Sequence, residues 1–141
     1  MARILSIDYG AKRTGVAVTD TLQIIANSLA TVPTNELMKF LADYLSREEV
    51  ETVVVGLPKQ SDSTLSENAA RVNGFVRKFK ERYPQMNVVM HDERYTTVLA
   101  HQAILSGGVK KSARRDKGLA DRVSAVIILQ SYLEQTKYNK L

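Results

Sequence analysis

The chain has 141 residues, of which 44% are apolar and 25% are charged. This length predicts a single domain spanning residues 1–141, and the composition excludes a disordered or collagen-like chain. The sequence contains no cysteine, which excludes disulfides, thiolate–zinc sites and a cysteine nucleophile. It also lacks both a signal peptide and the roughly 18 consecutive apolar residues of a membrane helix. We therefore expect a cytoplasmic protein with no membrane partner.

The net charge of +5 is unevenly distributed along the sequence. One basic block, residues 106–122, and a second, residues 71–82, each hold far more Lys and Arg than Asp and Glu. Such concentration favours a polyanionic partner, of which nucleic acid is the main class. The alternative is a solvated helix face and an exposed loop. That alternative is stronger for residues 71–82, because the block 106–122 includes Asp121, an acid discussed below.

The first half of the sequence predicts an antiparallel meander followed by a helix. Residues 3–10 form an apolar, branched run that stops at Gly10, and residues 16–19 form a second strand after the turn 10–15. A third strand is expected around residues 23–29, after the turn at Asp20. Pro33-Thr34-Asn35 then marks a helix start, and apolar residues follow at helical spacing up to Leu45.

The second half alternates strands and helices. Residues 52–56 form a continuous apolar run, which is typical of a covered parallel strand. A helix from the capping box at 64–67 closes before Pro84, and residues 87–90 form a fifth strand. Further helices are expected from about residue 96 to Gly107-Gly108 and over residues 117–134. The order βββαβαβαα predicts an α/β domain with a five-stranded mixed sheet flanked by helices.

Several carboxylates stand at unusual places in this pattern. Asp8 ends one apolar strand, where a charge is costly unless it is paired or bound to a cation. Asp92 and Glu93 follow another apolar strand on opposite faces, so only one of them can share a site with Asp8. Asp121 heads a helix stripe that continues through Ala125 and becomes apolar. Converging carboxylates suit Mg²⁺, and a pair of such ions assists phosphodiester hydrolysis. Taken singly, each acid also fits a cap or turn role.

Other residues near these acids are less specific. The turn 10–15 brings Lys12 and Arg13 next to Asp8, and its backbone N–H groups suit a phosphate, although hairpin turns often contain glycine and lysine. Arg94 and the threonines after it suit either phosphate binding or a helix cap. His91 and His101 lack the spacing of a ligand pair, which favours packing or surface roles.

Four segments together resemble the YqgF family. They are residues 8–20, Gly56-Leu57-Pro58, residues 92–97 and residues 121–133. Proteins of this family have a ribonuclease H-like fold and are described as Holliday-junction resolvases and as nucleases that mature the 5′ end of pre-16S ribosomal RNA. The resemblance covers nearly the whole chain. It implies an acidic metal site at the ends of the central strands.

Carried over position by position, the resemblance implies that Asp8, Glu93 and Asp121 are catalytic and bind Mg²⁺ or Mn²⁺. Glu93 is preferred to Asp92 from the family pattern alone, because strand periodicity does not choose between them. Unlike several ribonuclease H-like nucleases, this chain has no carboxylate at the end of the strand 52–56. The cations expected to grip phosphates are Lys12, Arg13, Arg94, Lys110, Lys111, Arg114, Arg115 and Lys117.

The expected function is therefore that of a metal-dependent endonuclease acting on structured nucleic acid, with pre-16S ribosomal RNA favoured over a DNA junction on family grounds. A homodimer would suit a twofold-symmetric junction. One alternative is a non-catalytic nucleic-acid-binding module on the same fold. Another follows from the Asp8-x-Gly10 hairpin, which also resembles the phosphate loop of sugar kinases and actin-like ATPases. Those proteins need a second ribonuclease H-like domain, for which 141 residues do not suffice.

Overall fold

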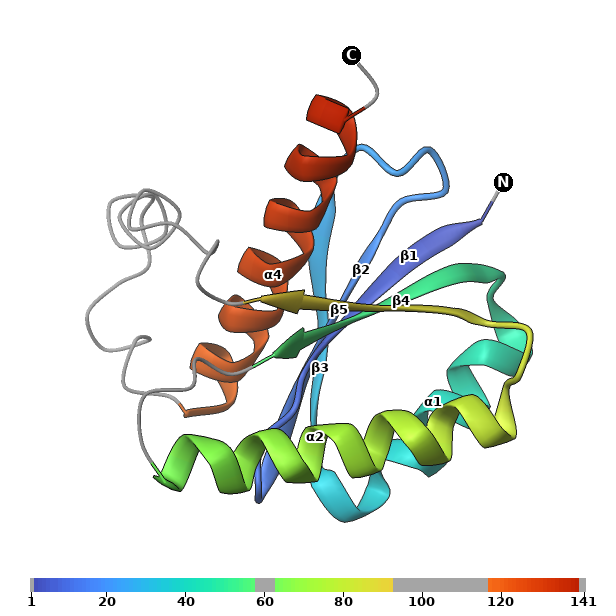
Figure 1. Ribbon diagram of the computed structural model, residues 1–141. Helices are drawn as coiled ribbons and strands as arrows, with labels where there is room; N and C mark the ends of the chain where they lie inside the picture. The colour runs from blue at the N-terminus through green and yellow to red at the C-terminus, as the bar shows by residue number, and fades with distance from the viewer. Residues whose placement is uncertain (1, 58–62, 93–116, 140–141) are drawn as a thin grey trace.

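The computed structural model of the protein describes residues 2–57, 63–92 and 117–139 (Figure 1). The elements in chain order are β1 (Arg3–Asp8), β2 (Arg13–Thr19), β3 (Ala26–Pro33), the 3₁₀ turn η1 (Thr34–Glu36), α1 (Leu37–Arg47), β4 (Val50–Leu57), α2 (Ser63–Arg82), β5 (Asn87–Asp92) and α4 (Lys117–Asn139). No helix in these ranges is long and apolar enough to span a bilayer.

The five strands form one mixed sheet in the order β3-β2-β1-β4-β5. The first three strands are antiparallel neighbours, as their short connections predict, whereas β4 and β5 continue the sheet parallel to β1. The carboxyl ends of β1, β4 and β5 therefore lie at the same edge of the sheet. This confirms the predicted α/β class and the five-stranded mixed sheet.

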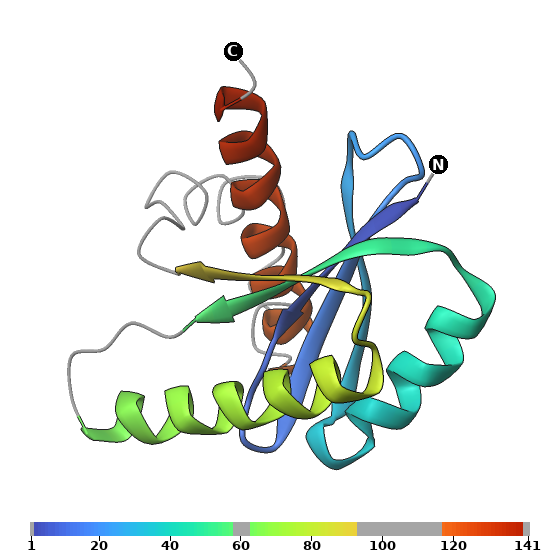
Figure 2. The same ribbon diagram turned by 45° about the vertical axis from the view of Figure 1, so that its right-hand side comes forward.

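Each face of the sheet has its own apolar core, and Figure 2 shows the resulting three layers. On one face, Leu5 and Ile7 of β1 pack with Leu41 of α1 and with Val72 and Phe79 of α2. On the other face, α4 is the one helix among the described residues that covers the sheet, and it packs against Ile4 of β1, Ala17 of β2 and Val54 of β4. Because successive strand residues point to opposite faces, a single strand such as β1 contributes to both cores.

The predicted boundaries needed correction at the third strand. It was expected around residues 23–29, but β3 begins at Ala26 and ends at Pro33. The carboxylate of Asp20 accepts hydrogen bonds from the backbone N–H groups of Ile24 and Ile25, both at 2.8 Å, and Gln23 has a φ of 60°. Backbone bound in this way is not available to the sheet. The expected helix from about residue 96 to Gly107-Gly108 lies outside the described residues.

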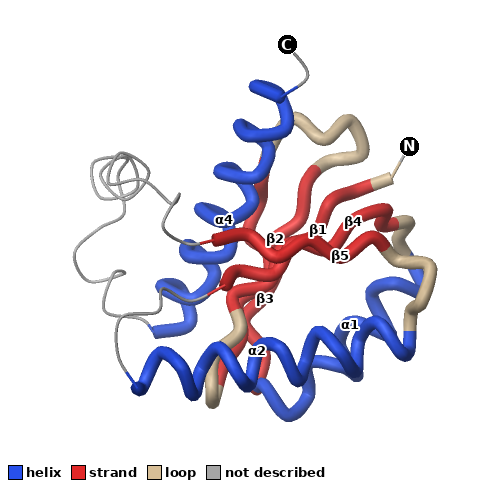
Figure 3. The backbone as a smooth tube through the Cα atoms, viewed as in Figure 1, coloured by secondary structure: helices blue, strands red, loops and turns tan. Residues whose placement is uncertain are grey.

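The meander and the last helix also differ in detail from the prediction. Arg13, expected in a turn, is the first residue of β2. The last helix extends to Asn139, beyond the expected end at 134. At the expected helix start, Thr34–Glu36 form a 3₁₀ turn and α1 begins only at Leu37. Thr34 is instead engaged in tertiary contacts, described below, that hold the first turn of the chain. In Figure 3, α1 and α2 lie on one side of the strands and α4 lies on the other.

The Asp20 loop gives a pH-dependent prediction. The backbone N–H of Ile25, followed by those of Ile24 and Leu22, holds the pKa of Asp20 below its ordinary value of 3.8. A lowered pKa in the folded protein means that the stabilisation is present above about pH 4 and is lost as the pH falls through the folded pKa. We expect the amide resonances of Ile24 and Ile25 to shift with this titration in NMR spectra, and Asp20→Ala to abolish it. Amide shifts that ignore the Asp20 titration would contradict this role.

Candidate active site

The carboxyl ends of the three parallel strands define the candidate site. Asp8 ends β1, Leu57 ends β4 and Asp92 ends β5. In Figures 1 and 2 these ends lie on the same side of the molecule as the first turn of α4. In open α/β sheets, ligands bind in the crevice at this edge, because the loops that follow the strands surround it.

A buried hydrogen bond sets α4 against β1. The hydroxyl of Ser6 donates to the backbone carbonyl of Ala125 at 2.7 Å, and both residues are fully buried. Asp8 lies two residues beyond Ser6 on the same face of the strand, about 6–7 Å further along it. Position 121 lies one helical turn, about 6 Å, before Ala125 on the same face of the helix.

Measured from the Ser6–Ala125 hydrogen bond, positions 8 and 121 lie toward the same end of the molecule. Figures 1 and 2 show α4 running roughly opposite to β1, so moving backwards along the helix corresponds to moving forwards along the strand. Both positions therefore belong to the α4 side of the sheet and to the carboxyl edge of the parallel strands. Asp8 is partly exposed and pairs in register with Gly15 of β2. The predicted convergence of these two positions is consistent with this geometry.

A second contact between α4 and the sheet bears on the choice between Asp92 and Glu93. His91 of β5 is buried, and its Nε2 lies 2.9 Å from the hydroxyl of Ser131 of α4. His91 therefore faces α4, which confirms the packing role expected for it. β5 ends at Asp92, and strand alternation gives position 92 the face opposite to that of His91. Glu93 itself lies outside the described residues.

Two of the predicted cations lie where the β1–β2 turn meets β2: Lys12 ends the turn and Arg13 begins the strand. Thr34 ties this turn to the start of η1, because its hydroxyl donates to the carbonyl of Gly10 at 2.7 Å and its backbone N–H donates to the carbonyl of Lys12 at 3.0 Å. A Cβ on Gly10 would overlap the carbonyl oxygen of Arg13, so the turn requires glycine at that position. Lys12 and Arg13 are exposed beside Asp8.

The remaining predicted cations are not brought to this turn by any described contact. Lys117 is the first residue of α4. The others, Arg94, Lys110, Lys111, Arg114 and Arg115, lie outside the described residues. Within the described ranges there is no group of three His, Asp or Glu side chains that could hold a metal ion. Of the three proposed carboxylates, Asp8 is the one whose side chain is described.

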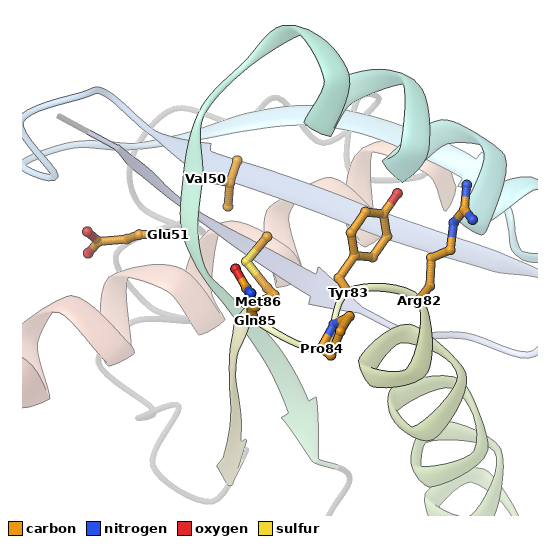
Figure 4. A pocket seen from close by; sticks show the side chains of 7 residues that line it. All are labelled: Val50, Glu51, Arg82, Tyr83, Pro84, Gln85 and Met86. Carbon is orange, nitrogen blue, oxygen red and sulfur yellow. The ribbon is translucent and has the colours of Figure 1, made fainter.

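Two hollows were not anticipated from the sequence. One is a basic groove, lined by Arg71, Arg77 and Lys78 of α2 on one side and by the Tyr9–Ala11 turn on the other. The basic block at 71–82 was the available signal for it. Figure 4 shows the second hollow, at Val50 and Glu51 where β4 begins. Because it lies at the amino end of β4, it is remote from the strand edge that holds Asp8.

The hydrogen bond from Ser6 predicts a measurable loss of stability. Ser6→Ala leaves the buried carbonyl of Ala125 without this donor, and the free energy of unfolding should fall by about 1–3 kcal/mol. Urea denaturation measures this loss, and we expect the m-value to be the same for the variant and the wild type. Ser46→Ala is the matched control, because the Ser46 hydroxyl donates to the backbone carbonyl of Asp43 at an exposed site. This substitution should lower the free energy of unfolding by less than about 0.5 kcal/mol. Equal losses in the two variants would contradict the assigned role of Ser6.

The turn at Gly10 gives a second stability prediction. Gly10→Ala should lower the free energy of unfolding by about 1–3 kcal/mol, because the new methyl group overlaps the Arg13 backbone. Thermal denaturation measures it. Gly74→Ala is the control for stability, since a Cβ at Gly74 meets nothing within 4 Å. An unchanged Tm for Gly10→Ala would show that the turn has another conformation.

Known proteins resemble this chain over nearly its whole length. The family model described as "RuvX: Holliday junction resolvase" matches residues 2–135. Over 138 residues the chain is 57% identical to the "Putative pre-16S rRNA nuclease" of Parabacteroides distasonis, covering 98% of this chain and 99% of that one. The protein of the same name from Bacteroides thetaiotaomicron is 52% identical over 138 residues, covering 98% of this chain and 100% of that one.

A solved structure independently supports the fold. Thermus thermophilus RuvC in complex with a Holliday-junction substrate matches with a TM-score of 0.61 over 96% of each chain, at 17% sequence identity. At this identity the match is evidence of fold alone, and the fold is ribonuclease H-like. With the family model covering almost every residue and full-length relatives more than half identical, the chain belongs to the RuvX (YqgF) family.

Proposed function

We propose that this protein is an endonuclease that hydrolyses phosphodiester bonds in structured nucleic acid, using Asp8, Glu93 and Asp121 as its catalytic carboxylates. The observation that carries the proposal is the hydrogen bond from Ser6 to Ala125, which relates Asp8 and position 121 to one edge and one face of the sheet. The family and the names of its relatives support the same class of reaction.

The donor chemistry fits a hard divalent cation. Carboxylate oxygens are the ligands that Mg²⁺ and Mn²⁺ accept, and the chain has no cysteine to favour a softer metal. Asp8, Glu93 and Asp121 would hold the ion or ions. When bound, such a metal activates water and stabilises the leaving oxygen of a phosphodiester. Glu93 is proposed rather than Asp92 because strand alternation within β5 gives position 92 the face opposite to that of His91, and His91 faces α4.

The cations of the chain would bind and orient the substrate. Lys12 lies on the turn that directly follows Asp8 and Arg13 begins β2 immediately after it, and Thr34 holds that turn in place. They are positioned to contact phosphates next to the cleaved bond. We propose that the remaining predicted cations extend this contact, namely Arg94, Lys110, Lys111, Arg114, Arg115 and Lys117. Phosphate contacts dominate the affinity of such surfaces and make binding depend steeply on salt.

The favoured substrate is pre-16S ribosomal RNA, because the two relatives described above are named for it. Cleavage at the 5′ end of that RNA is what the resemblance to the YqgF family implies. Holliday-junction cleavage is the second candidate, favoured by the family description and by the fold match to a resolvase–junction complex. A homodimer would serve the second candidate in particular, since a junction has twofold symmetry. In either case we propose that residues 1–141 act as one domain in the cytoplasm.

A nuclease assay with Mg²⁺ or Mn²⁺ tests the proposal on a pre-16S RNA fragment and a four-way DNA junction in parallel. Asp8→Asn and Asp121→Asn should each slow cleavage by on the order of 10²–10³-fold, because each removes one preorganised charge from the site. Asp43→Asn is the matched control, since Asp43 is exposed on α1 and pairs with Arg47. Its rate should equal that of the wild type.

Two outcomes would contradict the proposal. Full cleavage by Asp8→Asn would exclude Asp8 from the reaction. A wild-type protein that binds both substrates but cuts neither with Mn²⁺ would instead indicate a non-catalytic binding module on this fold.

A further inference from the structure

The basic groove beside α2 has a volume of about 630 Å³ and lies on the face of the sheet opposite α4. One wall consists of Arg71, Gly74 and Lys78, which are spaced three and four residues apart and so share one side of the helix. The opposite wall includes Ala11 of the β1–β2 turn and Asn35 of η1. The groove thus runs between α2 and the β1–β2 turn, which carries Lys12.

The groove is positively charged and its cations are available for a ligand. Arg71, Arg77 and Lys78 are exposed, and within the described part of the chain none of them forms an ion pair. The described residues that line the groove include no Asp or Glu. Unneutralised cations gathered around one concave surface favour an anionic ligand.

Gly74 is the second observation that points to a ligand. A glycine inside a helix destabilises it relative to alanine, and Gly74 lies near the middle of α2. A Cβ built on Gly74 meets no atom within 4 Å, so the described packing does not require glycine there. Because Gly74 lies between Arg71 and Lys78 on the groove wall, its missing side chain leaves room for a ligand to approach the helix backbone.

The groove also adjoins the proposed active site. Tyr9 lines it and directly follows Asp8 in the chain, and its ring is packed on that of Phe75 with centroids 5.2 Å apart. Phe75 itself is buried in the core between the sheet and α2. The floor of the groove is therefore built on fixed aromatic packing. A polymer lying across the carboxyl edge at Asp8 would reach the groove by passing over the β1–β2 turn.

We propose that this groove binds the sugar–phosphate backbone of the nucleic acid on the side that leads away from the cleavage edge. Arg71 and Lys78 contact successive phosphates, and Gly74 allows the strand to lie close against α2. The inference rests on the proposed function only for the class of ligand. It adds a binding surface, on the opposite face of the sheet, to the cations already proposed near Asp8.

Binding in EDTA tests the groove separately from cleavage. The probes are a fluorescein-labelled four-way DNA junction and a labelled pre-16S RNA fragment, and the readout is Kd by fluorescence anisotropy. Gly74→Ala should raise Tm by about 2–4 °C through helix propensity, yet weaken binding of at least one probe by about threefold or more, because the methyl group holds phosphates away from the flanking cations. A structural role for Gly74 would not raise Tm and weaken binding together.

Asn73→Ala is the matched control for Gly74→Ala. Asn73 is exposed on the same helix and outside the groove, so alanine should raise Tm without changing Kd.

A charge variant keeps the test independent of Gly74. Arg71→Ala/Lys78→Ala should weaken binding of that probe by about tenfold or more and reduce the slope of log Kd against log salt by about 2. Lys80→Ala is its control, because Lys80 is exposed on α2 but does not line the groove. Both Arg71 and Lys78 are exposed, so their loss should leave folding intact.

Kd values within about twofold of wild type for the double variant, or for a folded Gly74→Ala, would overturn the inference. Such a result would leave the proposed function intact if the wild type still cleaves with Mn²⁺ and Asp8→Asn does not. Conversely, weakened binding by the groove variants alongside full cleavage by Asp8→Asn would uphold the groove and contradict the proposed catalytic carboxylates.

Discussion

The hydrogen bond between the Ser6 hydroxyl and the Ala125 carbonyl is the contact on which the candidate active site depends. This bond joins residues that are 119 positions apart in the chain, and it is buried between the sheet and α4. A buried hydroxyl left without a hydrogen bond would destabilise the fold by more than the bond itself stabilises it. The bond therefore favours the one placement of α4 along β1 in which Ser6 and Ala125 meet. This placement of α4 along β1 also sets where position 121 lies relative to Asp8.

The opposite face of the sheet is organised by apolar packing. Phe79 and Val72 hold α2 against β1, β2 and β4, and this leaves the exposed stripe at Arg71, Gly74 and Lys78 facing the β1–β2 turn. Thr34 stabilises the β1–β2 turn through hydrogen bonds to the carbonyls of Gly10 and Lys12. One strand therefore serves two surfaces: Asp8 faces α4, whereas Tyr9, the next residue, lines the groove on the other side.

Most of the fold was predictable because it depends on local patterns. The apolar runs at residues 3–7 and 52–56 are typical of strands in a covered sheet, and the spacing of Val72, Val76 and Phe79 indicated a helix with one buried face. The third strand was placed too early because Leu22, Ile24 and Ile25 are apolar yet more than half exposed. Hydropathy could not reveal that Asp20 would bind their backbone N–H groups.

The sequence by itself determined the class of fold, the family and the isolated acids and cations from which a nuclease site is proposed, because these features are carried by motifs and short-range periodicity. Only the tertiary structure decided which face each residue serves. The His91–Ser131 contact, for example, shows which face of β5 meets α4 and so assigns position 92 to the other face. Likewise, residues 71–82 read as one basic block, but packing of α2 buried Val72, Phe75 and Phe79 and left Arg71 and Lys78 around an open groove. Such outcomes depend on contacts between segments distant in the chain, which no local pattern encodes.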